Sequence, residues 1–269
     1  MAIMLLERDG TVALDDLVSK FIPELPEYAK DLKVRHLVYH TSGLPDYMSI
    51  CRATAPVQNA EVINFLRSEK KLLFTAGSEH EYSNTGYVLL SEIVQPASGM
   101  TFPSFIQSQI FDKLGMTNSR VVKIGERRPF PNQASGYGEW PFFNLMNEVP
   151  CDYIYGDGGI YTSVEDYYKW LVALSKPGFL SEALLTKWFT AGTLDSGESV
   201  RYAYGWGLDD FDGIPMIAHS GSWTGYKSVA AIMPQKNIIV IVLSNYRNIP
   251  IWGIADELLG KHLKVSSKK

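Results

Sequence analysis

The apolar residues of this chain change their spacing near Gly197. Before it they recur every three or four positions, which is typical of amphipathic helices. After it, short apolar runs alternate with Gly, Pro and Asn turns, and the tight connection at residues 234–237 favours an antiparallel hairpin. These runs are residues 201–208, 216–219, 227–233 and 238–244. We therefore predict an α+β fold in one domain, 1–269, with a helical lobe at about 11–191 and an antiparallel sheet with a closing helix at about 200–263.

Capping residues divide the first part of the chain into helices. Residues 2–6 are apolar and lead to Gly10, so they read as the last turns of a buried helix. The run 14–21 has helical spacing and is ended by Pro23 and Pro26. Further helix starts are predicted at Asp31, Asn59, Asn84, Thr101, Ser163 and Ser181, and helix ends at Ser42-Gly43, Gly99, Gly115 and Ala191.

The composition argues against several classes of function. Of the 269 residues, 46% are apolar and 20% charged, and the formal net charge is −4. No basic stripe is present, so nucleic acid is not expected as the main partner. No apolar run is long enough to cross a bilayer, and localisation stays open. Cys51 and Cys151 could pair, but nothing in the sequence requires it, and low cysteine use fits a reducing compartment without proving one.

Residues 118–161 show little periodicity. So long an irregular stretch in a compact domain is usually functional or disordered, and here the aromatic content favours order. Its prolines, Pro129, Pro131, Pro141 and Pro150, alternate with aromatic residues that include Tyr137, Trp140, Phe142, Phe143, Tyr153 and Tyr155. Two interpretations stay open: an aromatic layer over the core, or a pocket wall in which Tyr155 contacts substrate.

Residues 80–87 (HEYSNTGY) precede the apolar helical run 87–94. Asn84 is a good N-cap residue, because its side-chain oxygen can accept an orphan backbone N–H. We expect this cap to hold Tyr82 at the positive end of the helix dipole, where a phenol loses its proton more easily. Taken alone, the triplet favours the simpler interpretation of a capped helix with a packed tyrosine.

A second element, residues 219–222 (HSGS), ends a predicted strand. Together with Tyr82-Ser83-Asn84 it resembles the serine β-lactamase and penicillin-binding-protein superfamily. The similarity is greatest to its class C β-lactamase-like branch, which also contains esterases, D-amino-acid peptidases and transacylases. Further segments agree in order, so the resemblance covers nearly the whole chain. They are residues 37–44 (LVYHTSGL), 156–163 (GDGGIYTS), 204–207 (YGWG) and 219–225 (HSGSWTG).

The resemblance implies the β-lactamase-like fold, with a site between the helical lobe and the sheet and no cofactor or metal. The superfamily combines a Ser-x-x-Lys, a Tyr-x-Asn or Ser-x-Asn, and a Lys-Thr-Gly or His-x-Gly. Tyr82 would then relay a proton to the leaving group, and Asn84 would orient the substrate. The His219 strand would lie along a small acyl, peptide or β-lactam substrate and help to balance its negative charge. Its further substrate-binding residues would be Ser220, Gly221 and Ser222.

The chain departs from this pattern at the nucleophile. In the superfamily, Ser-x-x-Lys opens the helix whose tail residues 2–6 resemble, and strands precede that helix. We therefore expect the nucleophile, its lysine and the N-terminal strands to be missing here. Two other Ser-x-x-Lys matches, residues 68–71 and 266–269, open no apolar helix. No Gly-x-Ser-x-Gly supplies a different hydrolase nucleophile.

Three hypotheses of function follow. In the first, the chain is a shortened serine hydrolase that acts on an ester, amide or β-lactam through an acyl-enzyme, and is inactive or impaired as it stands. In the second, it is a pseudoenzyme whose cleft binds peptidoglycan-like or acyl ligands without turnover. In the third, Ser83, Ser220 or Ser222 replaces the nucleophile, although none has a neighbouring base in the sequence.

Other patterns carry less weight. His36 and His40 have the spacing of metal ligands on a helix, but no His-Glu-x-x-His accompanies them, so we expect a structural role. Trp223 and Tyr226 would either line a pocket or pack at a strand edge. A chain that lacks part of a core helix and a sheet edge would expose apolar surface, so we also expect self-association.

Overall fold

The computed structural model describes residues 1–52, 55–126, 129–138 and 149–266. Trp140, Phe142 and Phe143 of the predicted aromatic segment, and residues 267–269 of the tail match, lie outside these ranges. The α-helices are α1 Ala2–Arg8, α2 Val34–Val38, α3 Asn59–Ser68, α4 Asn84–Ser98, α5 Phe102–Ile106, α6 Asp112–Leu114, α7 Val164–Ser175, α8 Glu182–Trp188 and α9 Ile251–Ser266. Among the described residues, no helix is long and apolar enough to cross a membrane.

The main sheet has five antiparallel strands in the order β3-β4-β5-β6-β7. They are β3 Tyr202–Ala203, β4 Trp206–Phe211, β5 Ile214–Trp223, β6 Tyr226–Met233 and β7 Ile238–Ser244. A small separate sheet pairs β1 Arg120–Val121 with β2 Ile160–Tyr161. Each large strand follows its neighbour in the chain, so the sheet is a meander. The predicted hairpin at residues 234–237 is confirmed, with Asn237 in the left-handed region at φ 52°.

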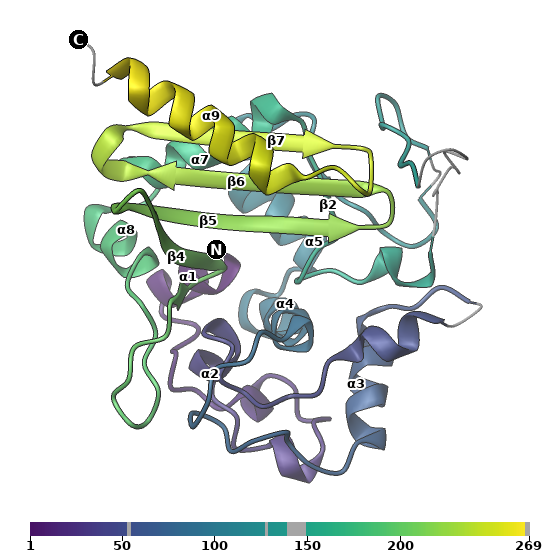
Figure 1. Cartoon of the computed structure of the whole chain (residues 1–269). Coiled ribbons are helices and arrows are strands. Elements are labelled where there is room, and N and C mark those ends of the chain that lie inside the picture. The colour runs from purple at the N-terminus through teal and green to yellow at the C-terminus, as the bar shows by residue number, and fades with distance from the viewer. Residues whose placement is uncertain (53–54, 127–128, 139–148, 267–269) are drawn as a thin grey trace.

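The helices lie on both sides of this sheet. Helix α9 packs across β6 and β7, and α7 covers β7 from the opposite face (Figure 1). The other helices, including α2, α3 and α4, form a lobe beside β5 (Figure 1). This is the predicted α+β, β-lactamase-like arrangement, and it brings the start of α4 close to β5.

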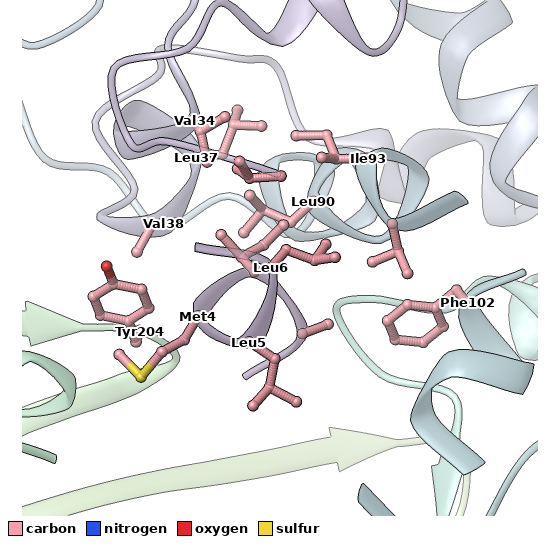
Figure 2. Packing of buried hydrophobic residues seen from close by; sticks show 14 of the residues in the cluster. Met4, Leu5, Leu6, Val34, Leu37, Val38, Leu90, Ile93, Phe102 and Tyr204 are labelled. Carbon is pink, nitrogen blue, oxygen red and sulfur yellow. The ribbon is translucent and has the colours of Figure 1, made fainter. Parts of the chain in front are cut away.

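Helix α1 is the centre of the core. All five residues from Ala2 to Leu6 are buried, as the apolar run predicted, and Gly10 ends the helix at φ 74°. Figure 2 shows the side chains of Met4, Leu5 and Leu6 among residues of three other helices and one turn. These neighbours are Val34, Leu37 and Val38 of α2, Leu90 and Ile93 of α4, Phe102 of α5, and Tyr204.

Glu7 fixes the end of α1 to the sheet. Its Oε1 accepts a hydrogen bond from Lys187 Nζ at 2.7 Å, and its Oε2 accepts one from Tyr204 Oη at 2.7 Å. Lys187 belongs to α8, and Tyr204 lies in the turn between β3 and β4. The helix at the centre of the lobe is therefore tied to both α8 and the first edge of the sheet.

Several predicted caps are confirmed and two helix predictions are wrong. Thr101, Ser163 and Ser181 each accept a hydrogen bond from the backbone three residues on, and Gly99 and Gly115 are left-handed. The run 14–21 forms only a 3₁₀ turn, Val18–Lys20, because its backbone pairs with residues 32 and 33. Asp31 caps nothing: α2 begins at Val34 and ends at Val38.

The predicted strand 201–208 is two strands. Tyr204 at φ 43° and Gly205 at φ 96° form a tight turn, so β3 and β4 are the arms of a hairpin. Helix α8 likewise ends at Trp188 rather than Ala191. The continuous helix expected after Thr101 contains a π-helical turn at Gln107–Phe111.

Candidate active site

A cleft of about 520 Å³ lies between the start of α4 and strands β4 and β5. It brings together five of the seven predicted site residues, which come from sequence positions more than 130 apart: Tyr82, Asn84, His219, Ser220 and Ser222. The lining also contains Gly207 of the superfamily-like segment 204–207 and four residues that the sequence did not indicate as site residues: Tyr202, Asp209, Ala218 and Trp252. The juxtaposition arises because the lobe packs beside β5, which carries His219.

Tyr82 stands at the mouth of α4 with 47% of its surface exposed. Its ring centroid lies 6.2 Å from that of His219, across the cleft. The expected loss of its proton at the helix dipole is wrong. Partial burial, and then the nearby carboxylates Asp157 and Asp46, raise the pKa of Tyr82. The phenol is therefore protonated at neutral pH and is a proton donor.

Ser83, not Asn84, is the N-cap of α4. Ser83 Oγ accepts the backbone N–H of Gly86 at 3.3 Å, and Asn84 is the first helical residue. Asn84 Nδ2 instead donates to Asp46 Oδ2 at 2.9 Å, and the backbone N–H of Asn84 donates to the same oxygen at 3.2 Å. Because an ionised carboxylate only accepts hydrogen bonds, this contact fixes the amide with its nitrogen toward Asp46.

His219 lies in the middle of β5, opposite Ala230 of β6. Burial lowers the pKa of His219, although a hydrogen bond to the Ser220 backbone opposes the shift. The imidazole is therefore neutral at neutral pH. It can exchange hydrogen bonds with a ligand, and a neutral imidazole would help to balance negative charge on a substrate by donating a hydrogen bond.

Ser220 and Ser222 line the cleft, whereas Gly221 between them faces β6. A Cβ at Gly221 would lie 2.5 Å from Ser228 Oγ on β6, so a larger residue here would require the Ser228 side chain to move. Gly221 thus has a packing role in the structure.

The structure does not bring Tyr155 to the cleft. Its ring stacks on Phe102 with 5.2 Å between centroids and 4° between planes. Its carbonyl oxygen accepts hydrogen bonds from Asn59 Nδ2 and Ser91 Oγ, which lie on α3 and α4. For this residue, the aromatic-layer interpretation of the segment 118–161 describes the structure better than the pocket wall.

Asp157 forms a partly buried pair with Tyr47 and acts on Tyr82. Tyr47 Oη donates to Asp157 Oδ2 at 2.6 Å, and burial raises the pKa of Asp157 to about 6. Asp46, which holds Asn84, acts in the same direction. The sequence did not single out either carboxylate, although each lies in or beside a superfamily-like segment, 37–44 or 156–163. Their location in or beside these segments was the one sequence signal that could have identified them as site residues.

His36 and His40 are buried and do not share a helix face, because α2 ends at Val38 and His40 is left-handed at φ 54°. No group of three or more His, Cys, Asp or Glu suited to a metal occurs in the described ranges. Trp223 and Tyr226 have structural contacts: Trp223 Nε1 donates to Asp152 Oδ1 at 2.6 Å, and Tyr226 Oη donates to the Ala134 carbonyl at 2.7 Å.

The fold is that of the serine β-lactamase and penicillin-binding-protein superfamily. The family model described as Beta-lactamase matches residues 1–258. The chain therefore belongs to the Beta-lactamase family, as its motifs indicated.

Comparison with individual proteins agrees. Over 265 residues the chain is 31% identical to Penicillin-binding protein 4* of Bacillus subtilis, covering 91% of this chain and 58% of that protein. It is 25% identical over 246 residues to the D-aminopeptidase of Gluconobacter oxydans, covering 88% of this chain and 46% of the relative. This chain thus spans about half the length of these curated relatives.

Solved structures show the same fold. The octameric penicillin-binding protein homologue from Pyrococcus abyssi superposes with a TM-score of 0.83 at 30% identity, over 98% of this chain and 63% of the other. The D-amino acid amidase from Ochrobactrum anthropi SV3, complexed with L-phenylalanine amide, has a TM-score of 0.75 at 25% identity, over 91% of this chain and 72% of the other.

Proposed function

We propose that this chain provides one wall of an acyl-hydrolase cleft that binds amides or peptides of D-amino acids. The observation that carries the proposal is the meeting of Tyr82, Asn84 and His219 in one cleft. The D-aminopeptidase and D-amino acid amidase relatives support the choice of substrate class. Esters and β-lactams present the same type of carbonyl and are the alternative substrates.

Each side chain has a role that matches its protonation state. Tyr82 is held as a phenol, so it donates a proton to the departing amine when the acyl–nitrogen bond breaks. The amide of Asn84, fixed by Asp46, orients the substrate. Neutral His219 forms hydrogen bonds along the substrate backbone beside Ser220 and Ser222.

The covalent step requires a serine nucleophile, and neither Ser68 nor Ser83 is placed to supply it. Of the two other Ser-x-x-Lys matches, Ser68 lies at the end of α3, where its Oγ donates to the Phe65 carbonyl at 2.7 Å. Ser83 Oγ is occupied as the cap of α4. We therefore expect the present chain to bind substrate without forming an acyl-enzyme, which is also the behaviour of a pseudoenzyme.

Ligand binding and covalent labelling test the two parts of this proposal separately. Titration with D-phenylalanine amide, followed by NMR, should show saturable binding. Tyr82→Phe and His219→Ala should weaken binding about tenfold each, the effect of losing roughly 1.4 kcal/mol of hydrogen bonding. Tyr168→Phe is the matched control, because Tyr168 is a similarly exposed tyrosine on α7, outside the cleft lining.

Intact-mass measurement after treatment with a penicillin or a fluorophosphonate should show no adduct. A stoichiometric adduct at Ser220 or Ser222 would overturn the claim that the nucleophile is absent and would establish a replacement. No saturable binding by a folded protein would overturn the assignment of the cleft itself.

A further inference from the structure

We infer that His40 is the positioning residue for Tyr82: it holds the phenol toward His219 through two hydrogen bonds to the flanking backbone and one tilted ring contact. The inference rests on the proposed role of Tyr82 and extends it to a residue that does not line the cleft. The sequence indicated only a structural role for His40 at a helix end.

His40 holds the chain on both sides of Tyr82. The His40 carbonyl oxygen accepts the backbone N–H of Glu81 at 2.9 Å. Its Nδ1 accepts the backbone N–H of Ser83 at 3.0 Å. The two donors are alternate residues of an extended segment, so their N–H groups point to the same side, and Tyr82 lies between two fixed points. The left-handed conformation of His40, φ 54°, turns both of its acceptors toward that segment.

The imidazole also sets the position of the Tyr82 ring. The Tyr82 ring lies 4.2 Å from the His40 ring centroid at an interplanar angle of 32°. Tyr87 stacks on the same imidazole at 4.8 Å and 25°. Two phenol rings cannot share one face of an imidazole, so Tyr82 and Tyr87 lie on opposite faces. Tyr87 lies on α4, and its Oη donates a 3.0 Å hydrogen bond to the Val38 carbonyl. Because Tyr87 is held in this way, the imidazole between the two rings also limits where the Tyr82 ring can lie.

A role in stability alone does not explain why this side chain is a histidine. The residue is fully buried, and its Nε2 has no hydrogen-bond partner among the residues that the structure describes. A buried donor without a partner costs about 1–3 kcal/mol. A phenylalanine would preserve the stack and an asparagine would preserve the acceptor at Nδ1, each without the unpartnered imidazole N–H. Histidine combines the ring contact with Tyr82 and the acceptor for the Ser83 N–H in one side chain.

The acceptor role of Nδ1 requires one protonation state, the neutral imidazole with its proton on Nε2. Burial among Tyr82, Tyr87 and Tyr202, with His80 and His219 near by, lowers the pKa of His40 to about 3. The imidazole therefore remains an acceptor across the neutral range, and its hold on Ser83 does not change with pH there.

Two variants separate the two contacts. His40→Asn keeps an acceptor near the Nδ1 position and tolerates the left-handed backbone, but it loses the stack. In that variant the Tyr82 ring should turn toward water, its pKa should fall toward the ordinary value, and its nuclear Overhauser contact with His219 should disappear. His40→Phe keeps the stack but loses the acceptor, so the Ser83 amide should exchange with solvent about tenfold faster, as expected for one lost hydrogen bond.

His36→Asn is the matched control. His36 is also buried, its Nδ1 also accepts a backbone N–H, and its pKa is also lowered by burial, but it contacts Lys33 instead of the 81–83 segment. This variant should lose stability without altering the titration of Tyr82 or the exchange of Ser83. If both His40 variants leave these properties unchanged, the inference is wrong.

The unmodified protein provides a test that does not depend on folding of a variant. Nitrogen-15 NMR should show His40 as the neutral Nε2–H tautomer between about pH 5 and pH 9. A charged imidazole or the Nδ1–H tautomer would remove the acceptor and overturn the inference. These measurements need no ligand, so failure to bind D-phenylalanine amide would contradict the proposed function while leaving the position of Tyr82 to be judged separately.

Discussion

The bond between Cys51 and Cys151 allows a quantitative prediction, because the sequence left this pairing open and the structure forms it. The two residues are 100 apart in sequence, and their Cα atoms lie 5.3 Å apart. They join two 3₁₀ turns, Tyr47–Arg52 and Pro150–Tyr153. We expect the replacement of both cysteines by serine, or reduction of the native protein, to destabilise the fold.

The magnitude follows from the length of the closed loop. Cross-linking ends about 100 residues apart removes denatured-state entropy worth about 4.7 kcal/mol at 25 °C. Residual structure in the denatured chain reduces this gain, so we expect a loss of about 3–5 kcal/mol. For a chain of this size each kcal/mol shifts the melting temperature by about 2–4 °C, so the midpoint should fall by roughly 10 °C.

Urea denaturation of the oxidised, reduced and double-serine proteins measures the loss directly. The double-serine protein is also the control for the reductant, which should not change its midpoint. A thiol reagent should label Cys51 and Cys151 only after reduction. Labelling of both thiols in the untreated native protein, or equal midpoints for the oxidised and double-serine forms, would refute the reasoning.

Three further predictions concern packing, pH and assembly. Leu5→Ala should cost about 2–5 kcal/mol in urea denaturation, since Leu5 is 2% exposed in the core, whereas Leu73→Ala at a 58% exposed position should cost less than about 0.5 kcal/mol. The pKa of Asp157, raised from 3.8 to about 6, means that folding favours its protonated form, so its contribution to stability falls as pH rises from about 4 to about 6. Asp157→Asn should remove that part of the pH dependence and raise stability at pH 7 by about 1–3 kcal/mol, as measured by denaturation at several pH values. The chain should self-associate at micromolar concentration in light scattering, because edge strand β7 carries no charge or proline, and a monodisperse monomer would contradict this.

Local signals predicted much of the fold. Thr101, Ser163 and Ser181 cap helices because their hydroxyls reach a backbone N–H three residues on, a contact that needs no tertiary information. Asn237 in the left-handed region similarly closes the β6–β7 hairpin as the turn residues indicated. In each case the determining contact lies within a few residues of the side chain.

The wrong predictions arose where two neighbouring residues could both cap a helix, or where distant backbone groups competed for the hydrogen bonds of a predicted helix. Ser83 and Asn84 are both good caps, and the position of Asp46 decides between them by engaging the Asn84 amide. Residues 14–21 have helical spacing, but pairing with residues 32 and 33 satisfies their backbone instead. Neither partner is visible from the local sequence.

The candidate site was predictable in its motifs but not in its electrostatics. Helix position alone predicted that Tyr82 would lose its proton easily, yet the structure raises its pKa. Partial burial raises the pKa of Tyr82 most, and the carboxylates Asp157 and Asp46 add to this effect, whereas the helix dipole acts only as a partial charge. These carboxylates come from two loops, one on each side of α4 in the sequence, so their combined field required the folded structure.

The same argument explains what the cleft needs in order to perform chemistry. Tyr82 is a proton donor here because partial burial, and then the carboxylates Asp157 and Asp46, raise its pKa, and a lysine ammonium within about 4–6 Å would lower that pKa again. The family's Ser-x-x-Lys supplies such a cation together with the nucleophile. The protonation state of Tyr82 therefore depends on whether a cation lies beside it: without one the phenol is favoured, and a lysine ammonium would favour the phenolate, which can act as a base.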